Sequence, residues 1–294
     1  MSLAELDTLL EMMAANPPPH GGPLELRGWF EAMHEALPVP EGVEIRRVAA
    51  GPAGADLILP AGAAPGRLII YYHGGGFVLG SARTHRTVAA NLAHAANIAV
   101  LAADYRLAPE HVFPAAHDDA LAAHQWAVAA GYEAIALAGD SAGGNLALST
   151  AIRARHAGDQ TLAALALMSP ALDFAADGET HHNVADDPIL SKELIGLFLG
   201  AYLPGQDLRD PAVTPLFADL SGLPPVLIHV GSREMLRDDS VTIARKLRAA
   251  NVWAELRIWD GMCHSWQLYA PLLREGMASI EEMALFLRGH LLAP

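Results

Sequence analysis

A serine with a glycine two residues away on either side is the first feature of the sequence that could do chemistry. Ser141 stands in the segment Gly139-Asp-Ser-Ala-Gly143, which follows a short apolar run and opens a helical pattern. A serine on a sharp strand-to-helix turn projects its hydroxyl from the sheet, and small neighbours let adjacent chain approach closely. In this setting the motif predicts a nucleophile for acyl transfer. The competing interpretation is a glycine-rich helix N-cap by Ser141.

A triple-glycine segment predicts the groups that would stabilise a negatively charged intermediate. Gly74, Gly75 and Gly76 follow His73 directly after an apolar run. Attack of a serine on an acyl carbon generates an oxyanion, and preorganised N–H donors lower its energy. We expect the oxyanion hole to use the N–H groups of Gly75 and Gly76, with Gly74 shaping the bend, and the N–H of Ala142. A phosphate loop is excluded because no Gly-Lys-Ser/Thr follows.

The histidines offer candidates for the base that such a serine requires. In a fold where the serine ends a strand in this way, the base comes last in the chain, after the nucleophile and the acid. His264 meets that condition, since it follows the strand pattern at 252–259. His229 lies inside an apolar strand pattern, and His290 lies in the C-terminal helical pattern. The sequence therefore predicts His264 as the base.

Alternating β-rich and helical patterns predict the elements that position these residues. From about residue 44, short apolar runs alternate with helices, which predicts a mostly parallel sheet covered on both faces. More than fifty residues separate the strand patterns near 169 and 225, and a gap of that length is typical of a lid. Helical segments occupy residues 1–43. Predicted strands are 43–49, 55–59, 67–72, 97–103, 133–138, 162–168, 225–230 and 252–259, and predicted helices are 84–95, 115–130, 142–156, 191–203, 240–250 and 272–291.

Composition excludes several classes of partner. Nineteen basic against 33 acidic residues give a net charge of −14 over 294 residues, so nucleic acid and anionic membrane surfaces are poor partners. No stretch of about 18 residues is apolar enough to span a membrane, and the N-terminus lacks a signal-peptide pattern. A single cysteine, Cys263, makes no internal disulfide, which suits a reducing compartment, and we expect a cytoplasmic location. His181 and His182 show no further ligands at zinc-binding spacing, so we expect no metal and no organic cofactor.

Three motifs together resemble one known family. His73 to Gly76, Asp104-Tyr-Arg-Leu-Ala-Pro-Glu110 and Gly139-Asp-Ser-Ala-Gly-Gly144 resemble the hormone-sensitive-lipase-like branch of the α/β-hydrolases, and its bacterial carboxylesterases most closely. The resemblance implies the α/β-hydrolase fold, an eight-stranded, mostly parallel sheet with helices on both faces and a helical cap. It implies cap helices in residues 1–43, a catalytic domain at 44–294, and a cap insertion at about 175–215. It gives the 104–110 segment a structural role.

The resemblance also bears on the base and the acid. The segment Asp260-Gly-Met-Cys-His-Ser-Trp266 resembles the family's Gly-x-x-His-x-Phe/Trp segment, which agrees with His264 as the base. The acid belongs on the loop after the strand pattern at 225–230, and aligning the family's Asp-Pro-Leu-Arg-Asp here places Glu234 at the catalytic aspartate. Either carboxylate can orient the imidazole. Asp238 is the alternative acid, and Asp239 and Asp260 are further candidates ranked after Asp238.

The function implied is hydrolysis of short- to medium-chain carboxylic esters by a Ser-His-Glu triad through an acyl-enzyme. A small-molecule ester is then the partner, and Phe77 is a candidate substrate contact. The same triad could serve an amidase, a lactonase or a thioesterase. A non-catalytic ligand-binding receptor and an oligomeric scaffold are the alternatives from other classes, although the receptors of this fold lack the histidine that His264 supplies. If the chain forms a homodimer, the strand at 252–259 is the sheet edge that the pattern favours.

Overall fold

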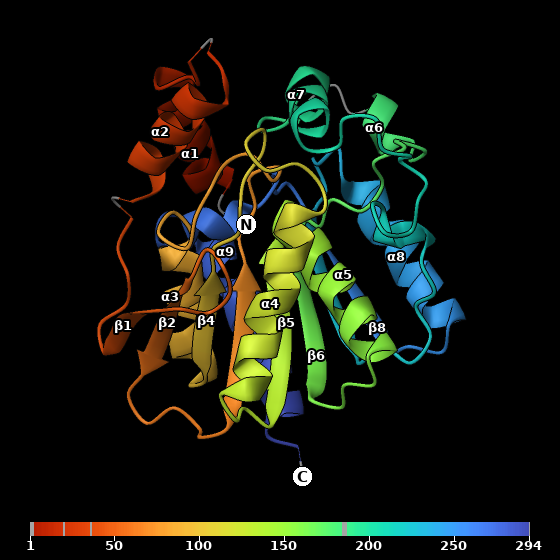
Figure 1. Cartoon of the computed structure of the whole chain (residues 1–294). Helices are drawn as coiled ribbons and strands as arrows, with labels where there is room; N and C mark the ends of the chain where they lie inside the picture. Colours follow the sequence, from red (N-terminus) through yellow and green to blue (C-terminus); the bar gives the residue numbers. More distant parts are fainter. Residues whose placement is uncertain (1–2, 20, 36, 184–186, 294) are drawn as a thin grey trace.

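The central feature of the structure is one sheet of eight strands. The structure is a computed structural model that describes residues 3–19, 21–35, 37–183 and 187–293. Its strands lie in the order β1-β2-β4-β3-β5-β6-β7-β8 (Figure 1). The bounds are β1 Val43–Val48, β2 Ala55–Pro60, β3 Arg67–Tyr72, β4 Ala99–Ala103, β5 Ala134–Asp140, β6 Leu162–Met168, β7 Val226–Gly231 and β8 Ala254–Trp259.

The pairing of the strands brings the candidate site residues to one edge of the sheet. β1 and β2 pair antiparallel, and β2 pairs antiparallel with β4, whereas β4, β3, β5, β6, β7 and β8 run parallel. Tyr72 at the end of β3 pairs with Gly139 in β5, and Asp140 pairs with Met168 at the end of β6. The segments that follow β3, β5, β6 and β7 therefore meet at the carboxyl edge, where α/β folds place their ligands.

Helices cover both faces of the sheet, which is why its inner strands are apolar throughout (Figure 1). Alternate residues of β3 enter two different core clusters: Ile70 packs with the helices of one face, and Ile69 packs with those of the other. The first face carries α4 (Ala115–Ala129), α5 (Ala142–His156) and α8 (Arg237–Ala249), and the second carries α3 (Arg86–Ala96) and α9 (Arg274–Leu291).

Four more helices lie beyond the carboxyl edge of the sheet (Figure 1). They are α1 (Leu3–Ala15), α2 (Pro23–His34), α6 (Thr180–Asn183) and α7 (Lys192–Tyr202). These helices fall within the ranges that the resemblance assigns to a cap, 1–43 and 175–215, although residues 1–2, 20, 36 and 184–186 of those ranges lie outside the described residues. The division of the chain into a cap and a catalytic domain stays a prediction.

Most expected elements form, with differences at their ends. α8 begins at Arg237 rather than at the expected 240, because Asp238 and Asp239 occupy its first turn, where negative charge is favourable. The helix expected from 272 is preceded by a 3-10 segment, η2, at Trp266–Leu272. β8 is the last strand of the sheet, as expected, and Ile258 in this strand is 49% exposed. A dimer through this edge stays a prediction. No described helix is both long and apolar enough to cross a membrane.

The close packing at the start of α5 gives a stability prediction. A Cβ at Gly143 would lie 2.0 Å from the carbonyl oxygen of Tyr72 and 2.6 Å from that of His73. Because both obstacles are backbone atoms, we expect Gly143→Ala to lower the free energy of unfolding by about 2 kcal/mol or more. A Cβ at Gly289, in α9, meets nothing within 4 Å. Gly289→Ala is therefore the matched control, and denaturant unfolding in which both variants behave alike would contradict the expectation.

Candidate active site

Ser141 occupies a strained turn between β5 and α5. Its backbone angles are φ 53° and ψ −119°, a conformation that is unusual for any residue with a Cβ. The turn is held by neighbouring chain, since the N–H of Ser141 donates to the Met168 carbonyl at 2.9 Å and its carbonyl accepts from Ala171 at 3.0 Å. The glycines flanking the turn allow this, because a Cβ at Gly139 would lie 2.4 Å from the Gly143 carbonyl oxygen. The structure thus presents the serine at the carboxyl edge of the sheet.

His264 and Glu234 form a buried pair. Nδ1 of His264 lies 3.0 Å from Oε2 of Glu234, and the two residues are 5% and 0% exposed. The other carboxylate oxygen, Oε1, accepts hydrogen bonds from the Ser169 hydroxyl at 2.7 Å and the Gly231 N–H at 2.5 Å. With Oε1 occupied by two donors, Oε2 is oriented toward the imidazole. Nδ1 then carries the proton that donates to Glu234, which leaves Nε2 as the free ring nitrogen.

The charge of Glu234 changes the acidity of the imidazole. Burial alone would lower the pKa of His264, but the hydrogen bond and negative charge of Glu234 outweigh burial and raise this pKa above its ordinary value. More distant carboxylates, Asp187 and Asp140, act in the same direction. The imidazole is thereby a stronger base than a free histidine, which suits proton abstraction from a hydroxyl.

The glycine loop after β3 divides into a structural part and an open part. Gly74 N–H donates to Oδ1 of Asp140 at 2.9 Å and lies 3.2 Å from Nε2 of His85, so it is committed to holding the bend. Within the described residues, no acceptor is found for the N–H groups of Gly75, Gly76 and Ala142. These three residues line the same cavity as Ser141. Of the oxyanion residues expected from the sequence, Gly74 is therefore the one whose N–H is already used.

Asp140 ties the glycine loop to the serine turn, a role that the sequence did not show. Its Oδ1 accepts from the Tyr71 hydroxyl at 2.7 Å as well as from Gly74 N–H, and His85 Nε2 lies 3.4 Å away. Burial acts to raise the pKa of Asp140, but the charge and hydrogen bonds of its partners prevail and lower it to about 2. A carboxylate at this position is therefore ionised across the working pH range. The position of Asp140 directly before Ser141 in the motif was the available signal in the sequence.

Ser169 is a second residue that the sequence did not single out. It follows β6 and has φ +44°. Its hydroxyl donates to Glu234 and accepts from the N–H of Ser265 at 3.2 Å, so one side chain links the acid to the loop that carries His264. Its position at the carboxyl end of a strand beside β5 was the only hint in the sequence.

The other candidate acids lie in different contacts. Asp238 accepts from the N–H of Thr180 at 3.0 Å, in the first turn of α8. Asp239 accepts from two backbone N–H groups, at Leu172 and Asp173, and the Ser232 hydroxyl lies 3.4 Å from Asp260. Glu234 is thus the carboxylate that the structure brings to His264.

A cluster in the wall of the same cavity brings together further metal-ligating side chains that the sequence did not show. Donor atoms of Asp173, His181 and Asp239 lie within 4.8 Å of one another. His181 Nε2 contacts Asp239 Oδ1 at 2.6 Å, and Asp239 Oδ2 is occupied by backbone N–H groups. A cation would have to displace the contact between His181 and Asp239. The contacts as they stand tie the 175–215 segment to α8.

Two other reactive side chains near the site are held in unreactive forms. His73 stacks on Tyr105 with ring centroids 4.0 Å apart, and burial, helped by His85, lowers its pKa to about 4. Burial, and then the charge of Glu234, raises the pKa of the Cys263 thiol to about 12. At neutral pH the first is an uncharged structural ring and the second is a protonated thiol, so neither competes with Ser141 or His264.

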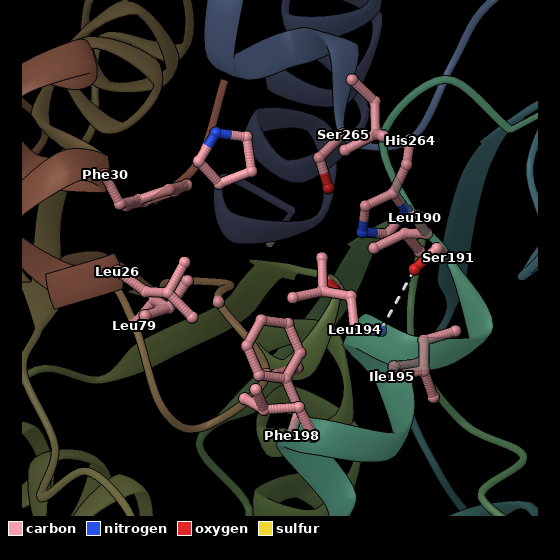
Figure 2. Close-up of a pocket in the computed structure, with 18 of the residues that line it drawn as sticks. Leu26, Phe30, Leu79, Leu190, Ser191, Leu194, Ile195, Phe198, His264 and Ser265 are labelled. Carbon is pink, nitrogen blue, oxygen red and sulfur yellow. Dashed lines mark hydrogen bonds between the residues drawn. The ribbon is translucent and has the colours of Figure 1, made fainter. Parts of the chain in front are cut away.

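One large cavity of about 940 Å³ contains both Ser141 and His264 and is lined mainly by apolar side chains. Figure 2 shows Leu26 and Phe30 on one side and Leu194 and Phe198 on the other, with His264 on the same side as Leu194. The first two come from α2 and the second two from α7. Phe77 also lines the cavity, although it is 1% exposed.

Comparison with known proteins identifies the family of the chain. A family model described as the alpha/beta hydrolase fold matches residues 69–268. An acetyl-hydrolase of Streptomyces hygroscopicus is 37% identical over 98% of this chain and 97% of its own, and an esterase of Acinetobacter venetianus is 36% identical over 89% and 88%. A solved esterase from the bacterial hormone-sensitive lipase family superimposes with a TM-score of 0.93 at 38% identity, covering 98% of each chain.

The chain belongs to the α/β-hydrolase family, and within it to the hormone-sensitive-lipase-like esterases of bacteria. The expected fold class is confirmed, since the eight-stranded, mostly parallel sheet carries helices on both faces.

The pair of His264 and Glu234 gives a prediction about pH. If the neutral imidazole is the base, kcat/KM rises with pH through an apparent pKa above the ordinary 6.5, because Glu234 raises the pKa of His264. Glu234→Gln removes that charge, so we expect the rising limb to move to lower pH and kcat to fall by about three orders of magnitude.

Asp238→Asn is the matched control for this substitution. It removes a nearby carboxylate in the first turn of α8 that does not contact the imidazole, so its pH profile and kcat should stay near those of the unmodified protein. The assignment of the acid is wrong if Asp238→Asn is the more damaging variant while both keep their thermal stability.

Proposed function

We propose that this carboxylic ester hydrolase cleaves its substrates through an acyl-enzyme on Ser141, with His264 as base, Glu234 as acid and the N–H groups of Gly75, Gly76 and Ala142 as the oxyanion hole. The observation that carries the proposal is the buried contact of 3.0 Å between His264 and Glu234, beside a serine on a strained turn that lines the same cavity.

The mechanism follows from the groups at the site. The Ser141 hydroxyl attacks the ester carbonyl while Nε2 of His264 takes its proton, and Glu234 stabilises the imidazolium that forms. The carbonyl oxygen becomes an alkoxide, which accepts hydrogen bonds from the three N–H groups that have no acceptor among the described residues. His264 then returns the proton to the departing alcohol. Water repeats these steps on the acyl-enzyme and releases the carboxylic acid.

The cavity supports short- to medium-chain esters as substrates. A space of about 940 Å³ covered by α2 and α7 is of the size that holds a small organic molecule, and it must accommodate both the acyl and the alcohol part. Its walls are apolar on both sides of Ser141, so burial of hydrocarbon drives binding. The proposed substrate is a small-molecule ester. The proposed reaction uses no metal and no organic cofactor.

The other interpretations are distinguishable. An amidase, a lactonase or a thioesterase could use the same triad. Measuring kcat/KM on a panel of amides, lactones, thioesters and simple esters distinguishes these activities. A receptor that only binds ligand has no need of a base oriented by a buried acid, whereas His264 is held by one. The ester hydrolase is therefore the function that the site favours.

The acyl-enzyme can be tested directly. A fluorophosphonate should add once to the chain, with the mass increase located on the tryptic peptide that contains Ser141. Ser141→Ala should abolish the labelling and lower kcat for p-nitrophenyl butyrate by about four orders of magnitude or more, because the nucleophile is gone while the fold is kept. Labelling of another residue, or turnover that survives in Ser141→Ala, would overturn the proposal.

The chain-length preference has its own measurement. Across p-nitrophenyl esters from acetate to palmitate, kcat/KM should reach its maximum at a short or medium acyl chain, because α2 and α7 bound the apolar space around Ser141. Assays are made below the critical micelle concentration of each ester. A maximum at palmitate would show that the cavity opens further than the structure indicates.

A further inference from the structure

Helix α7 contacts the glycine loop at two successive residues. A Cβ on Gly76 would lie 2.2 Å from Cδ2 of Phe198, so this ring packs directly over the backbone of the loop. One helical turn further on, Tyr202 stacks on Phe77 with ring centroids 4.3 Å apart and planes 19° from parallel. Residues four apart lie on the same helix face, so both rings belong to the surface that α7 presents to the loop.

Phe77 needs such support because its backbone is strained. Its φ is +62°, in a region that a bulky residue adopts only where its surroundings hold it there. Phe77 stacks on Tyr202 and on His117, and the rings of Phe77 and Phe174 pack edge to face with their centroids 6.1 Å apart. Its carbonyl accepts from the Ala108 N–H at 2.9 Å. The residue that ends the glycine loop is thus fixed mainly through its ring.

Tyr202 is itself anchored to the body of the enzyme. Its carbonyl accepts from the Phe113 N–H at 2.9 Å, and its hydroxyl lies 2.8 Å from Nδ1 of His117. Nε2 of His117 lies 3.1 Å from Oδ1 of Asn145, whose amide nitrogen donates to the Ala171 carbonyl at 3.0 Å.

The directions of these hydrogen bonds follow from one another. Because the Asn145 nitrogen donates to a carbonyl, its Oδ1 is the acceptor, so Nε2 of His117 carries the hydrogen. Nδ1 of His117 then accepts from the Tyr202 hydroxyl. Burial lowers the pKa of His117 to about 4, so the ring is neutral at neutral pH, as this arrangement requires. Asn145 lies on α5, the helix that begins immediately after Ser141, and the chain of contacts therefore joins α7 to the nucleophile.

We propose that Tyr202 is a positioning residue for the hydrolysis reaction: its ring holds Phe77, and with it the N–H groups of Gly75 and Gly76, in the orientation that the oxyanion hole requires. The inference rests on the proposed acyl-enzyme mechanism. Tyr202 is 0% exposed and is not among the described residues that line the cavity, so it touches no substrate. Its loss should therefore act more strongly on the transition state than on substrate binding, which it can affect only through Phe77.

The test compares Tyr202→Leu with Tyr202→Phe. The leucine variant loses the ring stack, so we expect kcat for p-nitrophenyl butyrate to fall about tenfold or more, with KM changed by less than about twofold. The phenylalanine variant keeps the ring and loses only the hydroxyl, so its kcat should stay within about threefold of the unmodified value. The inhibition constant of butylboronic acid, whose tetrahedral adduct on serine needs the oxyanion hole, should rise in Tyr202→Leu by the same factor as kcat falls.

Two further variants keep the test decisive. Leu287→Ala, in α9 on the opposite face of the sheet, creates a core cavity remote from the loop and should lower the melting temperature while kcat and boronate inhibition are kept. If Tyr202→Leu fails to fold, Tyr202→Met replaces it, because methionine fills buried space flexibly and has no ring to stack on Phe77. That variant should also weaken boronate inhibition and lower kcat.

The outcomes separate this inference from the mechanism on which it rests. The positioning role would be overturned if kcat and boronate affinity were unchanged in Tyr202→Leu. It would also be overturned if Leu287→Ala, with a melting temperature lowered as much as that of Tyr202→Leu, showed the same losses. In both cases Ser141→Ala would remain inactive, so the mechanism would stand. Turnover that persists in Ser141→Ala would instead overturn the proposed mechanism.

Discussion

The strained backbone at Ser141 is the constraint on which the rest of the site depends. A positive φ at a residue with a Cβ persists only where surrounding chain enforces it, and here the ends of β5, β6 and α5 do so. That enforcement requires glycine at 139 and 143, because backbone carbonyls occupy the space where their side chains would be. The turn directs one hydroxyl out of the sheet edge and leaves the N–H of Ala142 without a helical partner.

The partners of Ser141 meet it because parallel strands end at one edge. The glycine loop follows β3, Ser169 follows β6 and Glu234 follows β7, so each reaches the site from a rigid element. Buried hydrogen bonds then fix the orientation of each group: Asp140 holds the loop, and Ser169 holds the acid. A buried carboxylate without such donors would be costly, whereas Glu234 has two donors on one oxygen and an imidazole on the other.

The sequence could predict the elements and motifs that are local along the chain. The helix at 142–156 was expected with the bounds it has, because a glycine motif opens it after a clear apolar strand. Residues that act through contacts between distant segments could not be found in this way. Ser169 and Tyr202 belong to no motif that spacing reveals, and their partners lie 65 and 85 residues away. The start of α8 was misplaced because its charged first turn lacks the apolar periodicity that marks a helix.

We propose that Ser141, oriented by this turn, forms a tetrahedral adduct whose oxygen is held by the glycine loop. A crystal structure of the butylboronic acid adduct would show this oxygen and its hydrogen-bond donors. We expect boron bonded to Oγ of Ser141, with one boronate oxygen about 2.7 to 3.1 Å from the nitrogens of Gly75, Gly76 and Ala142. A boronate oxygen directed away from these three nitrogens, or an adduct on any residue other than Ser141, would contradict it.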